Sequence, residues 1–221
     1  MPMSRTNALA KAALAYAETG MPVLPAFPLT WSASGRRGPM GRRAWICGCS
    51  DPSCRAPGAH VARDANPSTC REDILATWNV ARPPGLMLVP GGSVDVWEVG
   101  CEIGATAMRL LEGQRLSVWP PTMRLPNGRW VIITSPLPEG HPLTEADASV
   151  IRRRNHRTPL LVPPSRTPNG RLRWLWSPRF PKTPLPNPHV ILGALMMASG
   201  HLGHRGAADD NRPDVVAGSP A

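Results

Sequence analysis

The spacing of apolar residues along the chain changes repeatedly between the helical and the strand period. Helical spacing predicts five helices, with Thr6 as the cap of the first and Thr69 and Glu72 at capping-box spacing in the second. The predicted helices cover Thr6–Thr19, Ser68–Trp78, Glu102–Leu111, a segment that begins at Thr144 and continues into Ile151, and Asn187–Ser199. Short runs rich in β-branched residues predict strands. These runs are Met21–Phe27, Leu86–Val89, Val94–Val99, Thr122–Leu125, Arg129–Thr134, Leu160–Ser165 and Arg171–Trp176.

Together these elements predict an α/β (α+β) fold in which helices flank a mixed, mainly antiparallel sheet. We expect that sheet to contain Val94–Val99, the hairpin 122–134, Leu160–Val162 and Arg171–Trp176. Asn127-Gly128 favours a type I′ turn in the hairpin. The 28 prolines and 20 glycines argue against an all-helical bundle. The prediction is one domain over residues 1–202, followed by a disordered tail over residues 203–221.

Two carboxylates lie inside the otherwise apolar run Val94–Val99. Asp95 and Glu98 each need a partner, a metal or solvent in such a strand, because burying an unpaired carboxylate is costly. Side chains alternate across a strand, so the two carboxylates point to opposite faces. Glu98 shares its face with Val96 and Gly100, which offer no ligand atoms. The pattern therefore predicts an active-site strand that lacks part of a metal site.

A loop over residues 47–60 contains three thiols and one imidazole. Three Cys and one His form a standard tetrahedral zinc set, and a site with four protein ligands leaves no open position for a substrate. We therefore predict a structural Zn²⁺ with ligands Cys47, Cys49, Cys54 and His60. The C-x-C spacing of the first pair is tighter than usual, and a Cys-rich loop with free thiols is the alternative. Cys70 and Cys101 lie outside this spacing and are interpreted as buried or incidental thiols.

The chain carries 25 Lys and Arg against 15 Asp and Glu, a formal net charge of +10. This excess favours a polyanionic partner, first DNA or RNA and second an anionic membrane surface. The run 152–157 is interpreted either as a solvated helix end or as a phosphate contact. The arginines that we expect to hold nucleic acid are Arg36, Arg37, Arg42, Arg43, Arg152, Arg153, Arg154, Arg157, Arg171 and Arg173.

No apolar run approaches the roughly 20 residues that a membrane span needs. The first residues show no signal-peptide layout. The expectation from both observations is a cytoplasmic protein without a membrane partner. In that reducing compartment, clustered cysteines are metal ligands more readily than disulfides.

Several motifs occur in a familiar order. The strand Gly20–Pro25 is followed by the loop that ends in Ala-Pro-Gly-Ala-His60, by the acidic strand, and by Val162-Pro-Pro-Ser165. Asn169-Gly170-Arg171 and Arg-Trp-Leu-Trp176 come next. Over residues 7–199 this order resembles the N-terminal domain of bifunctional DNA primase/polymerases, the prim-pol branch of the archaeo-eukaryotic primase superfamily.

The resemblance implies a nucleotidyltransferase of DNA replication. Active members present an Asp-x-Asp pair to two divalent metal ions, Mg²⁺ or Mn²⁺, with a His for the incoming nucleotide and a third acidic residue. Mapped onto this chain, the pair falls on Glu98 and Gly100, and the His falls on Trp130. The third acidic position falls within 151–155, where the chain has arginines. A register that uses Asp95 does not restore the motif, because its neighbour on the same face is Trp97.

The leading hypothesis is therefore a prim-pol domain with a degenerate, inactive catalytic centre that binds nucleic acid. Glu98 is the remnant catalytic residue and Asp95 a weaker candidate. One alternative is an active primase/polymerase with a rearranged metal site that recruits Glu102, His141 or His156. Another is a protein-interaction or regulatory module of a replication or mobile-element locus. A separate helicase or replication protein would supply unwinding.

Overall fold

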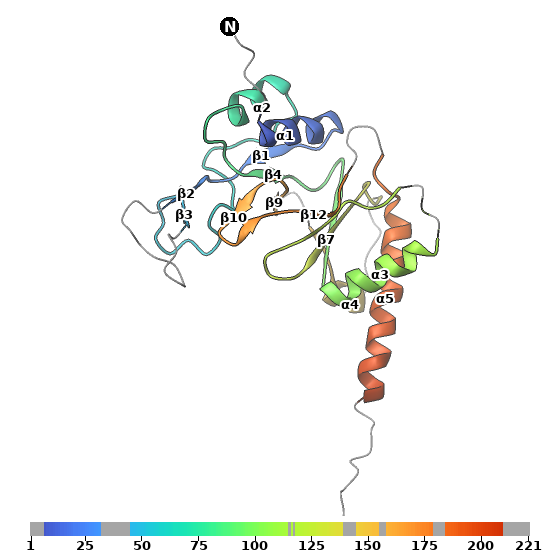
Figure 1. Cartoon of the computed structure of the whole chain (residues 1–221). Helices are drawn as coiled ribbons and strands as arrows, with labels where there is room; N and C mark the ends of the chain where they lie inside the picture. Colours follow the sequence, from blue (N-terminus) through green and yellow to red (C-terminus); the bar gives the residue numbers. More distant parts are fainter. Residues whose placement is uncertain are drawn as a thin grey trace, which may run out of the picture.

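The computed structural model describes residues 7–31, 45–114, 116, 118–138, 145–154, 158–178 and 184–209, without the side chains of 31, 145–147 and 203–209. Five helices and twelve strands lie in these ranges (Figure 1). The predicted nucleic-acid contacts Arg36, Arg37, Arg42, Arg43 and Arg157 lie outside the described residues, as do His141 and His156. No helix in the described ranges is long and apolar enough to cross a membrane.

A three-stranded antiparallel sheet forms one half of the molecule, with strand order β1-β4-β9. Its elements are α1 (Ala8–Glu18), β1 (Val23–Pro25), α2 (Arg71–Trp78), β4 (Leu86–Leu88) and β9 (Leu160–Leu161). Helices α1 and α2 pack together beside this sheet (Figure 1). Two small hairpins adjoin this half. They are β2 (Leu29–Trp31) with β3 (Trp45–Cys47), and β10 (Arg166–Thr167) with β11 (Gly170–Arg171).

A five-stranded antiparallel sheet forms the other half, with strand order β12-β6-β7-β5-β8. Its strands are β5 (Asp95–Val99), β6 (Thr122–Arg124), β7 (Trp130–Thr134), β8 (Ile151–Arg154) and β12 (Trp174–Trp176). Three helices accompany it, namely α3 (Cys101–Glu112), α4 (Glu145–Val150) and α5 (Pro188–Asp209). Helices α3 and α5 pack against each other on one face of the sheet (Figure 1).

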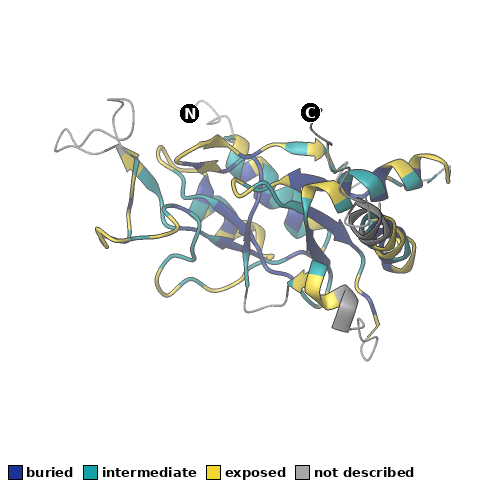
Figure 2. Cartoon of the chain, turned by 90° about the horizontal axis from the view of Figure 1, so that it is seen from below, coloured by how far each residue is buried: buried dark blue, intermediate teal, exposed yellow. Residues whose placement is uncertain are grey.

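The five-stranded sheet separates two hydrophobic cores, because its side chains alternate between faces. Val96 and Ile133 join the core that contains α1, α2 and the three-stranded sheet. Trp97 and Ile132 join the core under α3 and α5. The buried residues follow the central strands, and exposed residues lie on the outer helix faces and loops (Figure 2). Strand β5 is thus buried on both faces.

The α/β class and the antiparallel sheets are confirmed, but two predicted placements are wrong. Leu160–Leu161 pairs with β4 in the three-stranded sheet, not with the strands of the acidic sheet. The segment Ile151–Arg154 is an edge strand paired with β5, not a helix end. The first error arises because period 2 identifies a strand but does not say with which strand it pairs. The second arises because a run of three arginines shows neither the helical nor the strand period.

The hairpin β6–β7 is confirmed, but its turn is not type I′. Gly128 has a φ of +84° and donates its N–H to the carbonyl of Leu125, while Asn127 does not have a positive φ. Pro126 has no N–H to pair across a turn centred on Asn127-Gly128, and its φ near −65° suits the first central position of a type I turn. The turn is therefore a type I turn closed by a left-handed glycine.

Helix ends also differ from the predicted ones. Asn7, not Thr6, caps α1, with its Oδ1 accepting the N–H of Ala10 at 2.9 Å. At the start of α2 the N-cap is Cys70 and has no side-chain cap hydrogen bond; Ser68 accepts the Cys70 N–H instead. Helix α5 continues to Asp209, past residue 203 where we expected a disordered tail to begin, and residues 210–221 lie outside the described part.

Candidate functional site

Asp95 lies at the start of β5 and is 1% exposed. Arg153 binds it through two parallel hydrogen bonds, Nε to Oδ1 at 2.9 Å and Nη2 to Oδ2 at 2.8 Å. The backbone N–H of Leu137 donates to Oδ2 at 2.6 Å. The guanidinium of Arg153 also lies 5.7 Å from the centre of the Trp97 ring, within the range of a cation–π contact. Asp95 is thus a fully partnered structural carboxylate.

Glu98 lies on the opposite face of β5 and is 4% exposed. Its Oε1 accepts the Nε of Arg129 at 2.9 Å, and the same arginine donates to the Glu98 carbonyl at 3.1 Å. Its Oε2 accepts two nitrogens of Arg154, Nε at 2.9 Å and Nη2 at 2.6 Å. Both carboxylate oxygens therefore have charge-assisted donors, which are about twice as strong as neutral ones.

A third arginine lies beside the same carboxylate. The register of β5 and β8 sets Arg152 directly opposite Glu98, so both side chains leave the sheet on one face. Arg152 is exposed, and no acidic side chain of the described residues pairs with it. The guanidinium groups of Arg129 and Arg154 thus bind this carboxylate, and a third arginine lies across from it on the neighbouring strand. This edge of the sheet is therefore positively charged.

The structure also places the other positions of the mapped catalytic motif. Gly100 is the N-cap of α3, and a Cβ built on it would meet no atom within 4 Å. Trp130 lies opposite Val99, on the face away from Glu98, and packs so closely on α3 that a Cβ on Gly104 would lie 2.7 Å from its ring. The Trp130 side chain therefore packs in the core under α3 and α5, on the face of the sheet away from Glu98.

The residues of β7 and its turn that share the face of Glu98 are Arg129, Val131, which is directly opposite, and Ile133. Sequence reasoning missed Arg129. The sequence does contain a signal for it, the period-2 spacing of Arg129, Val131 and Ile133. Side chains at that spacing lie on one face of a strand, here the face that carries Glu98.

The predicted zinc ligands do come together. One donor atom from each of Cys47, Cys49, Cys54 and His60 lies within 4.8 Å of all the others. The Cys47 and Cys54 sulfurs are 3.1 and 3.4 Å from the His60 Nε2. Tetrahedral zinc with ordinary bond lengths would hold its ligand atoms about 3.5–3.8 Å apart, so the donor set fits the ion. Within the described residues, this is the one group of three or more ligating side chains.

The backbone of the loop is shaped for this cluster. Gly58 has a φ of +69°, and a Cβ at that position would lie 2.5 Å from the Leu29 Cγ. Its N–H donates to the Cys47 sulfur at 3.3 Å. Burial disfavours the Cys47 thiolate, but hydrogen bonds from Gly58, Cys49 and His60 outweigh it and lower the pKa of Cys47 to about 7. Burial raises the pKa of Cys54 to about 11. The surroundings of Cys47 therefore favour its thiolate more than those of Cys54 do.

The remaining predicted residues are scattered. Arg171 lies on the hairpin β10–β11, and Arg173 is exposed just before β12. Arg153 and Arg154, which we expected to hold nucleic acid, are instead engaged by the buried carboxylates. Cys70 and Cys101 are exposed, so the interpretation that these two thiols are buried is wrong.

Comparison with known proteins agrees with the order of motifs. A family model described as the N-terminal domain of bifunctional DNA primase/polymerase matches residues 13–188. That range begins in α1, contains both sheets and the Cys/His loop, and ends at the first residue of α5. No curated protein and no solved structure matches the chain.

Proposed function

The chain belongs to the family of N-terminal domains of bifunctional DNA primase/polymerases, and we propose that it binds nucleic acid without catalysing nucleotide transfer. The proposed absence of nucleotide transfer rests on one observation: both carboxylate oxygens of Glu98 accept hydrogen bonds from Arg129 and Arg154. In the mapped motif, these oxygens are where a divalent metal ion would bind.

The chemistry of nucleotidyl transfer explains why this pairing matters. Two metal ions activate the attacking hydroxyl and neutralise the triphosphate, and clustered carboxylates hold them. Here Glu98 has no second carboxylate on its face among the described residues, and Arg154 occupies the strand segment where the family supplies an acid. A metal ion would have to displace two guanidinium groups from a buried carboxylate and then lie beside them. Charge repulsion opposes that exchange.

The same arrangement favours phosphate. Arg152 is exposed and has no acidic partner within the described part of the chain. The two positive charges of Arg129 and Arg154 face the single negative charge of Glu98. Guanidinium groups bind phosphate oxygens through paired hydrogen bonds. The edge of β8 is therefore the surface on which we place the nucleic-acid backbone.

For the Cys/His cluster we propose Zn²⁺. Four protein donors complete a tetrahedral coordination shell, so the ion would have no open position and a structural role. Bound there, it would cross-link β3 to the loop that returns from residue 60 to the three-stranded sheet.

Primer synthesis and primer extension, each with Mg²⁺ and with Mn²⁺, test the loss of catalysis. We expect no incorporation by the wild type or by Glu98→Ala, with an unrelated active polymerase as the positive control. Incorporation by the wild type that disappears in Glu98→Ala would show a working, rearranged metal site and refute this part of the proposal.

Fluorescence anisotropy with labelled single-stranded and double-stranded oligonucleotides tests the binding. We expect binding at low salt that weakens in Arg152→Gln. Absence of binding to DNA and to RNA by the folded protein would refute this part and favour a protein partner.

A further inference from the structure

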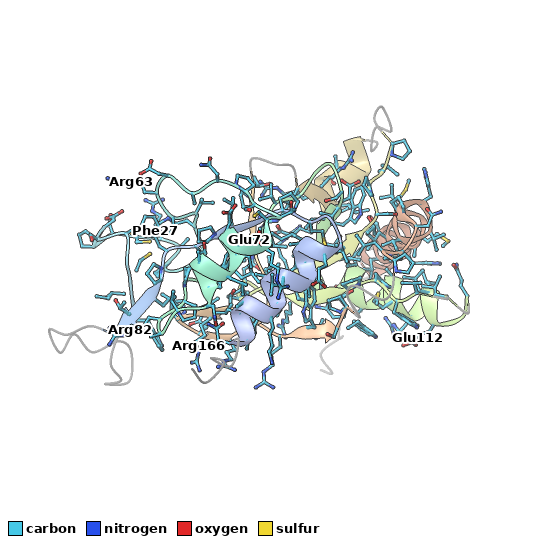
Figure 3. All side chains as sticks on the ribbon, turned by 90° about the horizontal axis from the view of Figure 1, so that it is seen from above. Phe27, Arg63, Glu72, Arg82, Glu112 and Arg166 are labelled. Atoms are coloured by element: carbon cyan, nitrogen blue, oxygen red, sulfur yellow. The ribbon has the colours of Figure 1, made fainter. Side chains whose placement is uncertain are left out.

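A cavity of about 310 Å³ opens between the start of α1, the hairpin β2–β3 and the hairpin β10–β11. None of the residues that line it belongs to the five-stranded sheet. Phe27 and Arg166, two of its lining residues, lie in the half of the molecule that contains α1 and α2 (Figure 3). The cavity is thus separate from the surface around Glu98.

Two arginines line this cavity from a single hairpin. Arg166 and Arg171 are directly opposite each other in the β10–β11 pair, so both side chains leave the hairpin on the same face. Like charges in that position are destabilising. Both are exposed, and no acidic side chain of the described residues pairs with either, whereas Arg153 and Arg154 beside β5 are matched to carboxylates. The pair is arranged to receive an anionic group.

The start of α1 adds to this positive potential. Ala8 and Leu9 are in the first turn of the helix and line the same cavity. The N-terminal turn of an α-helix carries a partial positive charge.

The rest of the wall is apolar and partly aromatic. Phe27, Leu29 and Trp45 line the same cavity as the charged hairpin. Aromatic faces bind nucleobases by stacking, without preference for one base. A volume of about 310 Å³ is at the lower end of ligand pockets and suits one nucleotide unit.

We propose that this cavity binds a single nucleotide, with its phosphate between Arg166 and Arg171 and its base against Phe27, Leu29 and Trp45. The source of the nucleotide is either a free nucleoside monophosphate or the end of a nucleic-acid strand. This inference is independent of the proposed function, because the site shares no residue with the surface around Glu98.

Calorimetric titration of the full chain tests the proposal with dAMP and with deoxyadenosine, which lacks the phosphate. We expect deoxyadenosine to bind at least about tenfold more weakly than dAMP. We expect Arg166→Gln and Arg171→Gln each to lower the affinity for dAMP by about tenfold, because each removes one charge-assisted contact. The matched control is Arg109→Gln, which removes an exposed arginine of α3 that does not line the cavity. Its affinity for dAMP should stay within about twofold of the wild type.

Thermal unfolding of each variant establishes that it is folded. Absence of dAMP binding by the wild type would overturn the proposal. So would equal binding of dAMP and deoxyadenosine, or unchanged dAMP affinity in folded Arg166→Gln and Arg171→Gln.

Competition with oligonucleotides identifies the source. Displacement of dAMP by a 5′-phosphorylated strand, and not by its 5′-hydroxyl counterpart, assigns the cavity to a strand end; displacement by neither assigns it to a free nucleotide. Arg152→Gln should weaken the oligonucleotide contact proposed above and leave dAMP binding unchanged, so the two proposals fail separately.

Discussion

At the scale of single residues, the arginines of β8 explain how β5 keeps two carboxylates in a buried strand. Arg153 and Arg154 are consecutive, so they leave the strand on opposite faces, and each meets the carboxylate of β5 on its own face. Asp95 and Glu98 thereby obtain the partners that a buried charge requires. The arginines also suit an edge strand, where charged side chains discourage pairing with another chain.

Removing Arg153 should destabilise the fold. In Arg153→Ala the buried Asp95 keeps the Leu137 N–H as its donor, and we expect a loss of about 2–3 kcal/mol in the free energy of unfolding. The estimate lies below that for a fully buried pair because the Arg153 side chain is 37% exposed. Urea denaturation measures the loss.

Arg152→Ala is the control for that experiment, since it removes an exposed arginine from the same strand and should change stability by about 0.5 kcal/mol or less. The pair Arg153→Ala with Asp95→Asn should cost less than the sum of the two single variants. Equal stability of Arg152→Ala and Arg153→Ala would show that the ion pair contributes nothing to the fold.

At the scale of elements, the Cys/His loop shows how a segment with little core of its own is held in place. Its residues carry few apolar side chains, so we propose that a Zn²⁺ held by the four Cys and His side chains, with the hydrogen bond from Gly58 to Cys47, takes the place of hydrophobic packing. Phe27 joins the loop to β1, with its ring centre 4.8 Å from that of His60. Structural metal sites contribute folding free energy in the same way.

Metal analysis tests this element directly. Native mass spectrometry and elemental analysis should find one zinc per chain, and Cys54→Ser should lose it together with several degrees of thermal stability. Cys70→Ser, a change at an exposed thiol outside the cluster, should retain both. Zinc-free protein that melts at the same temperature as the zinc-loaded form would contradict a structural role.

At the scale of the whole molecule, the five-stranded sheet decides where charge is displayed. One face is closed by α3 and α5, and the other packs on the half with the three-stranded sheet, so the arginine run 152–154 emerges at the edge strand β8. A formal net charge of +10 adds a long-range attraction for polyanions.

Nucleic-acid affinity should therefore fall steeply with salt. The logarithm of the association constant should decrease linearly with the logarithm of the salt concentration. Arg152→Gln should reduce the magnitude of this slope by about 1, the value for one phosphate contact. Arg109→Gln on α3, an exposed arginine on the far side of the sheet, should leave the slope unchanged. A slope near zero for the wild type would exclude binding through the phosphate backbone.

Local patterns were sufficient for most elements and for the metal ligands. The strand β5, the hairpin β6–β7 and helices α1 and α3 follow from hydrophobic period, and the four ligands follow from residue type within one short loop. These features depend on neighbours in the chain, whose spacing is visible in the sequence.

Strand partners and charge partners were not visible in the same way. The sequence determined the α/β class, the Cys/His cluster and the net positive charge, because each of these is a property of residue type and local spacing. Only the tertiary structure decided that β9 leaves the acidic sheet, that Arg129 and Arg154 engage Glu98, and that Arg166 and Arg171 lie opposite each other beside an apolar cavity. Those contacts depend on strand register and on which face each side chain takes, and the free energy of burying the whole core sets both.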